Sequence, residues 1–264
     1  MNILIQLMET PHQLEQVRKL EAAIWGRDES VPIHQTSTAV KNGGFVLGAF
    51  IHDELVGFQY SFPGFDGNIP YLCSHTLGIK KEFRKMGVGR KLKLAQKEMA
   101  LRKNYELITW TYDPLETVNG YLNLHKLGAV CSTYLNDAYG ELADGLNDGL
   151  ASDRFLVSWS IQNEKRVSRI DSIETINCAF QVSIRNGFLF PNQVQAKVHD
   201  NLVLVPVPGN FQQMKRESMS IAKEWRNRCR SVFTSYFDEG WEATDLRRDN
   251  KNNNLFYYLL EKRR

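Results

Sequence analysis

The sequence predicts an α/β protein, and three observations lead to this fold class. Segments rich in β-branched and aromatic residues alternate along the chain with amphipathic helical segments. A basic turn with two glycines joins one of these strands to one of these helices. After about residue 162 the regular alternation of strand-like and helix-like segments gives way to a polar, irregular stretch. We therefore expect a first domain over residues 1–162 and a smaller C-terminal α/β extension over residues 163–264, ordered strand, helix, strand, strand.

The composition is that of a globular protein. The chain has 264 residues, with 33 Lys and Arg against 30 Asp and Glu, a net charge of +3. Apolar residues make up 42% and charged residues 24%, which excludes a disordered chain or a polybasic tail. No apolar stretch approaches the roughly 20 residues of a membrane span. The four scattered cysteines form no C-x-x-C pair. We expect a reduced, cytoplasmic protein without a metal site or a membrane partner.

The first helix is predicted to begin at a capping box. Thr10 can cap, Pro11 suits the first helical position, and Gln13 closes the box. The apolar stripe that follows ends at Gly26. A second, shorter helix is predicted over Ile33–Lys41, before a pair of glycines.

The first predicted strand is the short apolar segment Asn2–Met8, and a hairpin follows the two helices. Phe45–His52 and Leu55–Phe62 are rich in strand-forming residues, and Asp53 and Glu54 separate them. After a glycine- and proline-containing loop, Tyr71–Ile79 reads as the next strand.

The remaining elements follow the same criteria of periodicity and turn residues. We expect a helix over Gly89–Lys103, a strand over Glu106–Tyr112, a helix over Glu116–Leu127, and strands over Ala129–Tyr139 and Arg154–Ile161. Residues 163–201 are polar and irregular. We then expect a strand over Leu202–Val207, a long helix over Phe211–Phe237, and strands over Trp241–Arg248 and Leu255–Glu261.

The strongest chemical signal is the basic turn, Arg84-Lys85-Met86-Gly87-Val88-Gly89, between a strand and a helix. Glycines let the backbone approach a ligand, and a helix N-terminus presents unpaired N–H groups with a partial positive charge. Arg84, Lys85, Arg90 and Lys91 add positive charge, so the turn suits a pyrophosphate. The P-loop pattern is absent, and the third glycine of a dinucleotide-binding turn is missing.

In this context the sequence resembles the GNAT superfamily of N-acetyltransferases. The carriers are the turn Arg84–Gly89, the preceding Leu77-Gly78-Ile79, the following Leu107–Thr111, and Lys126-Leu127-Gly128. The resemblance covers residues 2–161. Asp113-Pro114-Leu115 and Ser152-Asp153-Arg154-Phe155 further resemble a subgroup of predicted acetyltransferases with a C-terminal extension.

The resemblance implies a fold, a cofactor and an activity. The fold is a mixed, mostly antiparallel sheet flanked by helices. The activity is direct transfer of an acyl group, most simply acetyl, from acyl-CoA to an amine of a small molecule or amino acid. The alternative is a non-catalytic CoA-binding or regulatory protein. The residues implied to contact the cofactor are Leu77, Gly78, Ile79, Arg84, Lys85, Met86, Gly87, Val88, Gly89, Arg90, Asn119 and Asn123.

The same resemblance leads to candidate catalytic residues. The position where some members hold a glutamate base falls near Cys73, and His75 lies two residues on, on the same side of the strand. A partly buried structural histidine is the alternative. The tyrosine that many members use to protonate the thiolate aligns with Leu124, so the candidate substitutes are Tyr121, one turn earlier, and His125, the next residue. Packing is the alternative role for Tyr121.

Several assignments stay open. Asn119 and Asn123 lie four residues apart and are expected to share a helix face, which either binds a ligand or faces solvent. Cys73 and Arg154 are candidate substrate contacts. Arg154 either clamps a substrate carboxylate or belongs to a structural ion pair.

The C-terminal helix is basic, which raises the question of nucleic-acid binding. Its cations include Lys215, Arg226 and Arg230, but Glu217 and Glu224 interrupt them and no stacking motif accompanies them. We expect a solvated face of an amphipathic helix and no nucleic-acid partner. A homodimer is left open.

Overall fold

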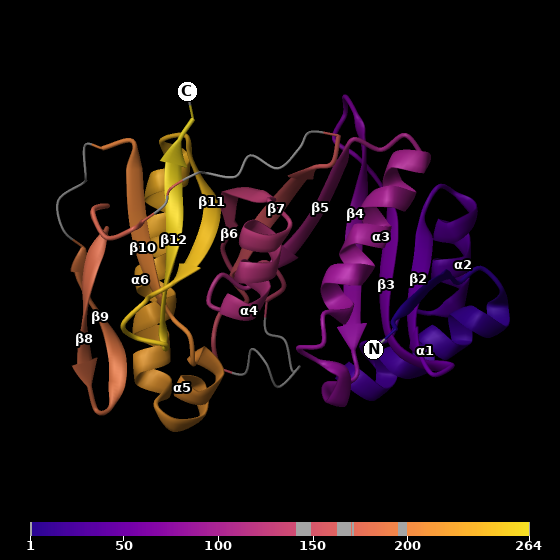
Figure 1. Cartoon of the computed structure of the whole chain (residues 1–264), viewed down its shortest axis with the longest axis horizontal. Helices are drawn as coiled ribbons and strands as arrows, with labels where there is room; N and C mark the ends of the chain where they lie inside the picture. Colours follow the sequence, from indigo (N-terminus) through magenta and orange to yellow (C-terminus); the bar gives the residue numbers. More distant parts are fainter. Residues whose placement is uncertain (1, 141–148, 163–169, 171, 195–199, 264) are drawn as a thin grey trace. The chain divides into compact units, whose positions relative to one another are not determined.

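A computed structural model of the chain describes residues 2–140, 149–162, 170, 172–194 and 200–263. The chain divides into two compact units (Figure 1). Unit 1 comprises Met1–Trp110 and Trp159–Glu164, and unit 2 comprises Thr111–Ser158 and Lys165–Arg264. The predicted domain boundary after residue 162 stays a prediction. No helix in the described part of the chain is both long enough and apolar enough to span a membrane.

Unit 1 is built on strands in the order β1-β2-β3-β4-β5. Their bounds are β1 Leu4–Leu7, β2 Phe45–Ile51, β3 Glu54–Phe65, β4 Pro70–Ile79 and β5 Leu107–Tyr112, and β5 runs into unit 2. The first three pairings are antiparallel, and β4 pairs with β5 in parallel. The predicted β2–β3 hairpin is confirmed. Its turn residues His52 and Asp53 adopt φ values of 46° and 63°.

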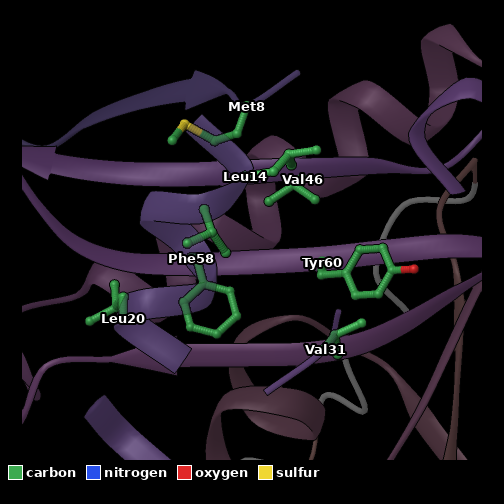
Figure 2. Close-up of a cluster of buried hydrophobic side chains, with 8 residues drawn as sticks. Met8, Leu14, Leu20, Val31, Val46, Phe58 and Tyr60 are labelled. Carbon is green, nitrogen blue, oxygen red and sulfur yellow. The ribbon is translucent and has the colours of Figure 1, made fainter. Parts of the chain in front are cut away.

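Helices cover both faces of these strands. Helix α1, Pro11–Trp25, begins with the predicted capping box at Thr10, and α2 spans Ile33–Lys41. Side chains of α1 and of the strands belong to one apolar cluster, in which Leu20 lies near Phe58 and Val31 lies near Tyr60 (Figure 2). Gln59 and Ser61 alternate with these residues along β3, so they point to the opposite face, where α3, Val88–Arg102, packs.

Unit 2 contains a second set of strands in the order β7-β6-β11-β12-β10. The bounds are β6 Val130–Leu135, β7 Arg154–Ser160, β10 Leu202–Pro208, β11 Trp241–Arg248 and β12 Leu255–Lys262, and all neighbours in this order pair antiparallel. Helix α6, Met219–Asp238, packs on them. The ring of Phe233 on α6 lies 4.7 Å from that of Phe155 and 5.3 Å from that of Tyr258, so aromatic contacts fill this core.

The expected fold class is confirmed, because the strands are mixed and mostly antiparallel, helices flank them, and a further strand, helix, strand, strand series follows. Three local expectations were wrong. The helix predicted over residues 116–127 is a short α4, Thr117–Gly120, followed by a π-helical turn η2, Tyr121–Lys126. The long helix predicted over residues 211–237 is broken at Ser218 into α5, Phe211–Glu217, and α6.

The third difference lies in the stretch that we expected to be irregular. It contains a hairpin of β8, Phe180–Arg185, and β9, Phe188–Val194. Asn186 and Gly187 form its turn, with φ values of 50° and 78°. An Asn-Gly pair is a strong hairpin signal that was present in the sequence. Residues 163–169 and 195–199 of this stretch lie outside the described residues.

Candidate functional site

The basic turn connects β4 to α3 within unit 1. A 3-10 turn η1, Lys81–Phe83, leads into it, and Gly87 is the N-cap of α3 with φ +83°. A left-handed residue at this position favours glycine because a Cβ would be strained. Lys85 also has a positive φ, +65°. The Arg84 side chain donates a hydrogen bond to the carbonyl of Ile79 (3.2 Å) and so ties the turn to the end of β4.

The turn carries the features of an anion site. The first backbone bond within α3 runs from the Lys91 N–H to the Gly87 carbonyl (3.1 Å). The N–H groups of Val88, Gly89 and Arg90 precede that bond and have no acceptor inside the helix. The first turn holds no acidic residue, and the side chains of Arg90 and Lys91 are exposed beside it. These groups fit a phosphate or pyrophosphate.

Strand β4 has an open edge beside this turn. It pairs with β5 only at Leu72 opposite Ile108 and Cys73 opposite Thr109, although β4 continues to Ile79. In the described part of unit 1, the backbone from Ser74 to Ile79 therefore has a strand partner, β3, on one edge alone. Such an edge offers N–H and C=O groups to an extended ligand.

The predicted cofactor residues Leu77, Gly78 and Ile79 lie on this open part of β4. Gly78 is buried, and a Cβ there would meet side-chain atoms of Phe58, Ile24 and Trp25 at 2.6–2.9 Å. Close packing against α1 and β3 therefore requires the glycine at this position. The structure brings this open edge and the turn into one continuous segment of unit 1.

A β-bulge places His75 in an unusual position on β4. Tyr60 pairs with Thr76 and Ser61 pairs with Ser74, so His75 has no partner residue on β3. A bulge redirects one side chain of a strand. The His75 ring contacts the rings of Tyr60 (5.6 Å between centroids) and Phe62 (5.5 Å). Cys73 is paired with Phe62 and so lies on the same face, as predicted.

The surroundings of His75 favour a neutral imidazole. One side of the ring is open to solvent, and the aromatic rings on the other side lower its pKa below the ordinary 6.5 by burial. A neutral imidazole can accept a proton at pH 7. Burial raises the pKa of Tyr60 to about 12, so its hydroxyl remains a donor. Burial also raises the pKa of the Cys73 thiol, which argues against Cys73 as a nucleophile.

A buried lysine on the other face of β4 is a feature that we did not predict. Lys93 on α3 is 3% exposed, and its ammonium nitrogen donates to the Ser74 hydroxyl at 2.9 Å. The same nitrogen lies 3.4 Å from the centroid of the Trp110 ring. Burial lowers the lysine pKa well below 10.5. Lys93 is three residues before the buried Gln96, and this polar pair on an otherwise apolar helix stripe was the available signal.

In unit 2, the two asparagines assigned to the cofactor differ in exposure. Asn119 is exposed, whereas Asn123 is 4% exposed. The two side chains therefore have different surroundings, and their shared role in binding the cofactor stays a prediction. Asn123 lies in η2, where the Leu127 N–H bonds the carbonyl of Leu122 five residues earlier.

Tyr121 also lies in η2 and stacks on His125, with ring centroids 4.5 Å apart. His125 in turn bonds Asp245 through Nδ1 (2.9 Å), so its ring is held from both sides. Leu124, at the position where the resemblance expects a tyrosine, is fully buried.

Arg154 contacts the Tyr139 ring, with its guanidinium 5.3 Å from the centroid, and donates to the Asp153 carbonyl (2.9 Å). The carboxylate of Asp153 pairs with Arg230 and accepts a hydrogen bond from the Tyr134 hydroxyl. Asp153 and Arg230 thus form an ion pair next to Arg154. No group of three or more His, Cys, Asp or Glu among the described residues is placed to hold a metal ion.

No family model and no curated protein matches this sequence. Solved structures with a similar fold include a GNAT-family acetyltransferase from Streptococcus pneumoniae, at 14% identity and TM-score 0.47, covering 60% of this chain and 98% of that one. Another is the ribosomal-protein-S18-alanine N-acetyltransferase from Escherichia coli, at 11% identity and TM-score 0.49, where the match covers 63% of this chain and 99% of that one. A third is the IAA acetyltransferase from Bacillus cereus, at 16% identity and TM-score 0.45, where the match covers 60% of this chain and 99% of that one. This chain is similar to them in fold.

Proposed function

We propose that this protein is an acyl-CoA-dependent N-acyltransferase of the GNAT type, which transfers an acyl group, most simply acetyl, directly to an amine. The observation that carries the proposal is the open edge of β4, which leads into a glycine turn at the N-terminus of α3. An extended pantetheine arm needs backbone partners of this kind, and its pyrophosphate needs N–H groups and cations. Both requirements meet within unit 1.

The residues of this segment fit CoA. The N–H groups of Val88, Gly89 and Arg90 suit the phosphate oxygens, and Arg84, Lys85 and Arg90 supply positive charge. A bound acyl-CoA supplies a thioester carbonyl that an amine can attack. We assign to the backbone near Leu77 the polarisation of that carbonyl.

The chain's side chains then handle protons. Neutral His75 accepts a proton from the substrate ammonium, which gives the amine the lone pair it needs for attack. The new C–N bond forms as the C–S bond breaks, the attacking nitrogen gives up a second proton, and the leaving thiolate takes up a proton. We assign that last step to Tyr121, which lies one turn before Leu124, the position where the resemblance expects a tyrosine.

Calorimetry with CoA and with pantetheine, which lacks the phosphates, tests the anion site. In Arg90→Glu, charge reversal at the helix N-terminus is expected to weaken CoA binding by about tenfold or more and to leave pantetheine binding unchanged. Lys103→Glu is the matched control, because Lys103 is exposed at the other end of the same helix. An unmutated protein that does not bind CoA at millimolar concentration would contradict the proposal.

A second candidate is a CoA-binding regulatory protein without activity. The buried Leu124, where the resemblance expects a proton-donating tyrosine, favours it. Release of free thiol from acetyl-CoA in the presence of a panel of amines separates the two candidates. CoA binding without thiol release from any amine would select the regulatory candidate.

A further inference from the structure

Unit 1 contains a groove of about 490 Å³ between α2 and β3, which we call the α2–β3 groove. One wall is formed by His34, Thr38 and Asn42, which lie four residues apart and so share one face of the helix. The floor is formed by the half-buried Phe62, and Tyr60, two residues earlier on the same face of β3 and 2% exposed, also lines the groove.

The groove adjoins the candidate base. The same two aromatic rings that line it, Tyr60 and Phe62, contact the ring of His75. One end of a molecule bound in the groove therefore lies near His75. The groove therefore adjoins the segment of β4 whose other edge, the one facing β5, is open, since His75 belongs to that segment.

The groove has an aromatic floor and no acidic wall. Its lining contains no Asp or Glu among the described residues. The nearby carboxyl of Glu21 is 3% exposed, accepts a hydrogen bond from the Val31 N–H (2.9 Å), and lines a separate cavity of about 10 Å³ behind Tyr60. Glu21 is thus not presented to a ligand in the groove.

We propose that the α2–β3 groove binds the non-reacting part of the acceptor, and that the acceptor is a monoamine with an aromatic or apolar body. The proposal rests on the proposed function and names its substrate class. Aromatic rings favour a flat or apolar group by burial and stacking. A second ammonium, as in a polyamine or an aminoglycoside, would lose water there without meeting a carboxylate.

The α2 wall of the groove offers one further polar contact. The Asn42 amide donates to the Thr38 carbonyl (2.7 Å), and the Thr38 hydroxyl donates to the His34 carbonyl (2.7 Å). The Asn42 amide oxygen is left to accept from a neutral donor on the ligand, such as a phenol or an indole N–H.

The test compares binding of 2-phenylethylamine, hexylamine and spermidine by calorimetry, in the presence of CoA. We expect the two monoamines to bind at least about tenfold tighter than spermidine, because only spermidine brings additional charges. Phe62→Ala should weaken 2-phenylethylamine by about tenfold or more. Phe65→Ala should have no effect, since Phe65 is 66% exposed on the same strand and does not line the groove.

Gln35→Glu provides a sharper variant. Gln35 is exposed, lines the groove and lies in the first turn of α2, where a carboxylate is tolerated. The new carboxylate should shift the preference toward spermidine by about tenfold. Gln35→Met, equally long and uncharged, should leave the preference toward monoamines unchanged.

The proposal would be overturned by spermidine binding as tightly as 2-phenylethylamine to the unmutated protein, or by an unchanged preference in Gln35→Glu. Stronger binding of a peptide N-terminus than of any monoamine would also overturn it. Failure of the proposed function looks different. A monoamine that binds in the groove but receives no acyl group would refute the activity and leave the assignment of the groove in place.

Discussion

Arg226 of α6 donates hydrogen bonds to both carboxylate oxygens of Asp113, at 2.8 and 2.5 Å. Arg226 is 2% exposed, and Asp113 also caps the following loop by accepting the Leu115 N–H at 2.9 Å. The C-terminal helix therefore anchors the segment that leads into α4. We expected a solvated basic face on this helix, and for Arg226 that expectation was wrong.

Removal of one partner of this pair is predicted to destabilise unit 2. Asp113→Asn leaves a buried guanidinium without its counter-charge, which typically costs about 3–5 kcal/mol. Urea unfolding followed by near-UV circular dichroism measures the change. Asp113→Leu combined with Arg226→Met should recover most of the loss, because an apolar pair leaves no buried charge.

The control for this experiment is an exposed ion pair. Glu54 pairs with Lys80 at the surface of unit 1, and Glu54→Gln should change the stability by no more than about 0.5 kcal/mol. Equal losses in Asp113→Asn and Glu54→Gln would show that burial does not strengthen the Arg226 pair.

His75 is predicted to control the pH profile of the reaction. Its folded pKa lies below 6.5, so the imidazole is neutral at pH 7, and activity should fall as the pH drops through the lowered pKa. His75→Gln should reduce kcat by about 10²–10⁴ and remove that inflection. CoA affinity should not change. His12→Gln, at an exposed position of α1, is the control.

The same titration affects stability. The folded protein favours neutral His75 and the unfolded chain binds the proton with the ordinary pKa of 6.5. The contribution of His75 is therefore present above pH 6.5 and is lost as the pH falls from there toward the folded pKa. A pH-independent difference in unfolding free energy between the unmutated protein and His75→Gln would contradict this assignment.

Lys93 is predicted to make stability depend on pH in the alkaline range. The Trp110 face favours the charged ammonium by about 2 kcal/mol at most, whereas burying an ammonium costs several kcal/mol, so burial lowers the lysine pKa on balance. Between the folded pKa and 10.5 the unfolded chain binds more protons, and stability rises with pH. Lys93→Met should be more stable than the unmutated protein at pH 7, and the difference in their unfolding free energies should become smaller toward pH 10.5. If this difference, measured by urea titration, does not change with pH, Lys93 is charged in the folded protein.

Tyr121 is predicted to act in turnover and not in folding. Tyr121→Phe keeps the ring that stacks on His125, so the unfolding midpoint should not change. A lost proton donor should lower kcat by about tenfold or more with the CoA affinity preserved. If kcat is unchanged in Tyr121→Phe, the role of Tyr121 is packing and not proton transfer. Tyr139→Phe, at an exposed position, is the control.

Local sequence signals determined much of this protein. The capping box at Thr10, the β2–β3 hairpin and the basic turn at Gly87 formed where they were predicted, because each depends on residues close together in the chain. The order of strands and helices followed from periodicity, and with it the fold class.

Tertiary structure decided the rest. The bulge that redirects His75 depends on pairing with β3, and the open edge of β4 depends on where β5 stops pairing. The burial of Lys93 and the partnership of Arg226 with Asp113, which lie 113 positions apart, arise only when distant segments pack. Spacing along a chain specifies local conformation. Which charges lose their water, and which partners replace it, is fixed by contacts between segments that the sequence separates.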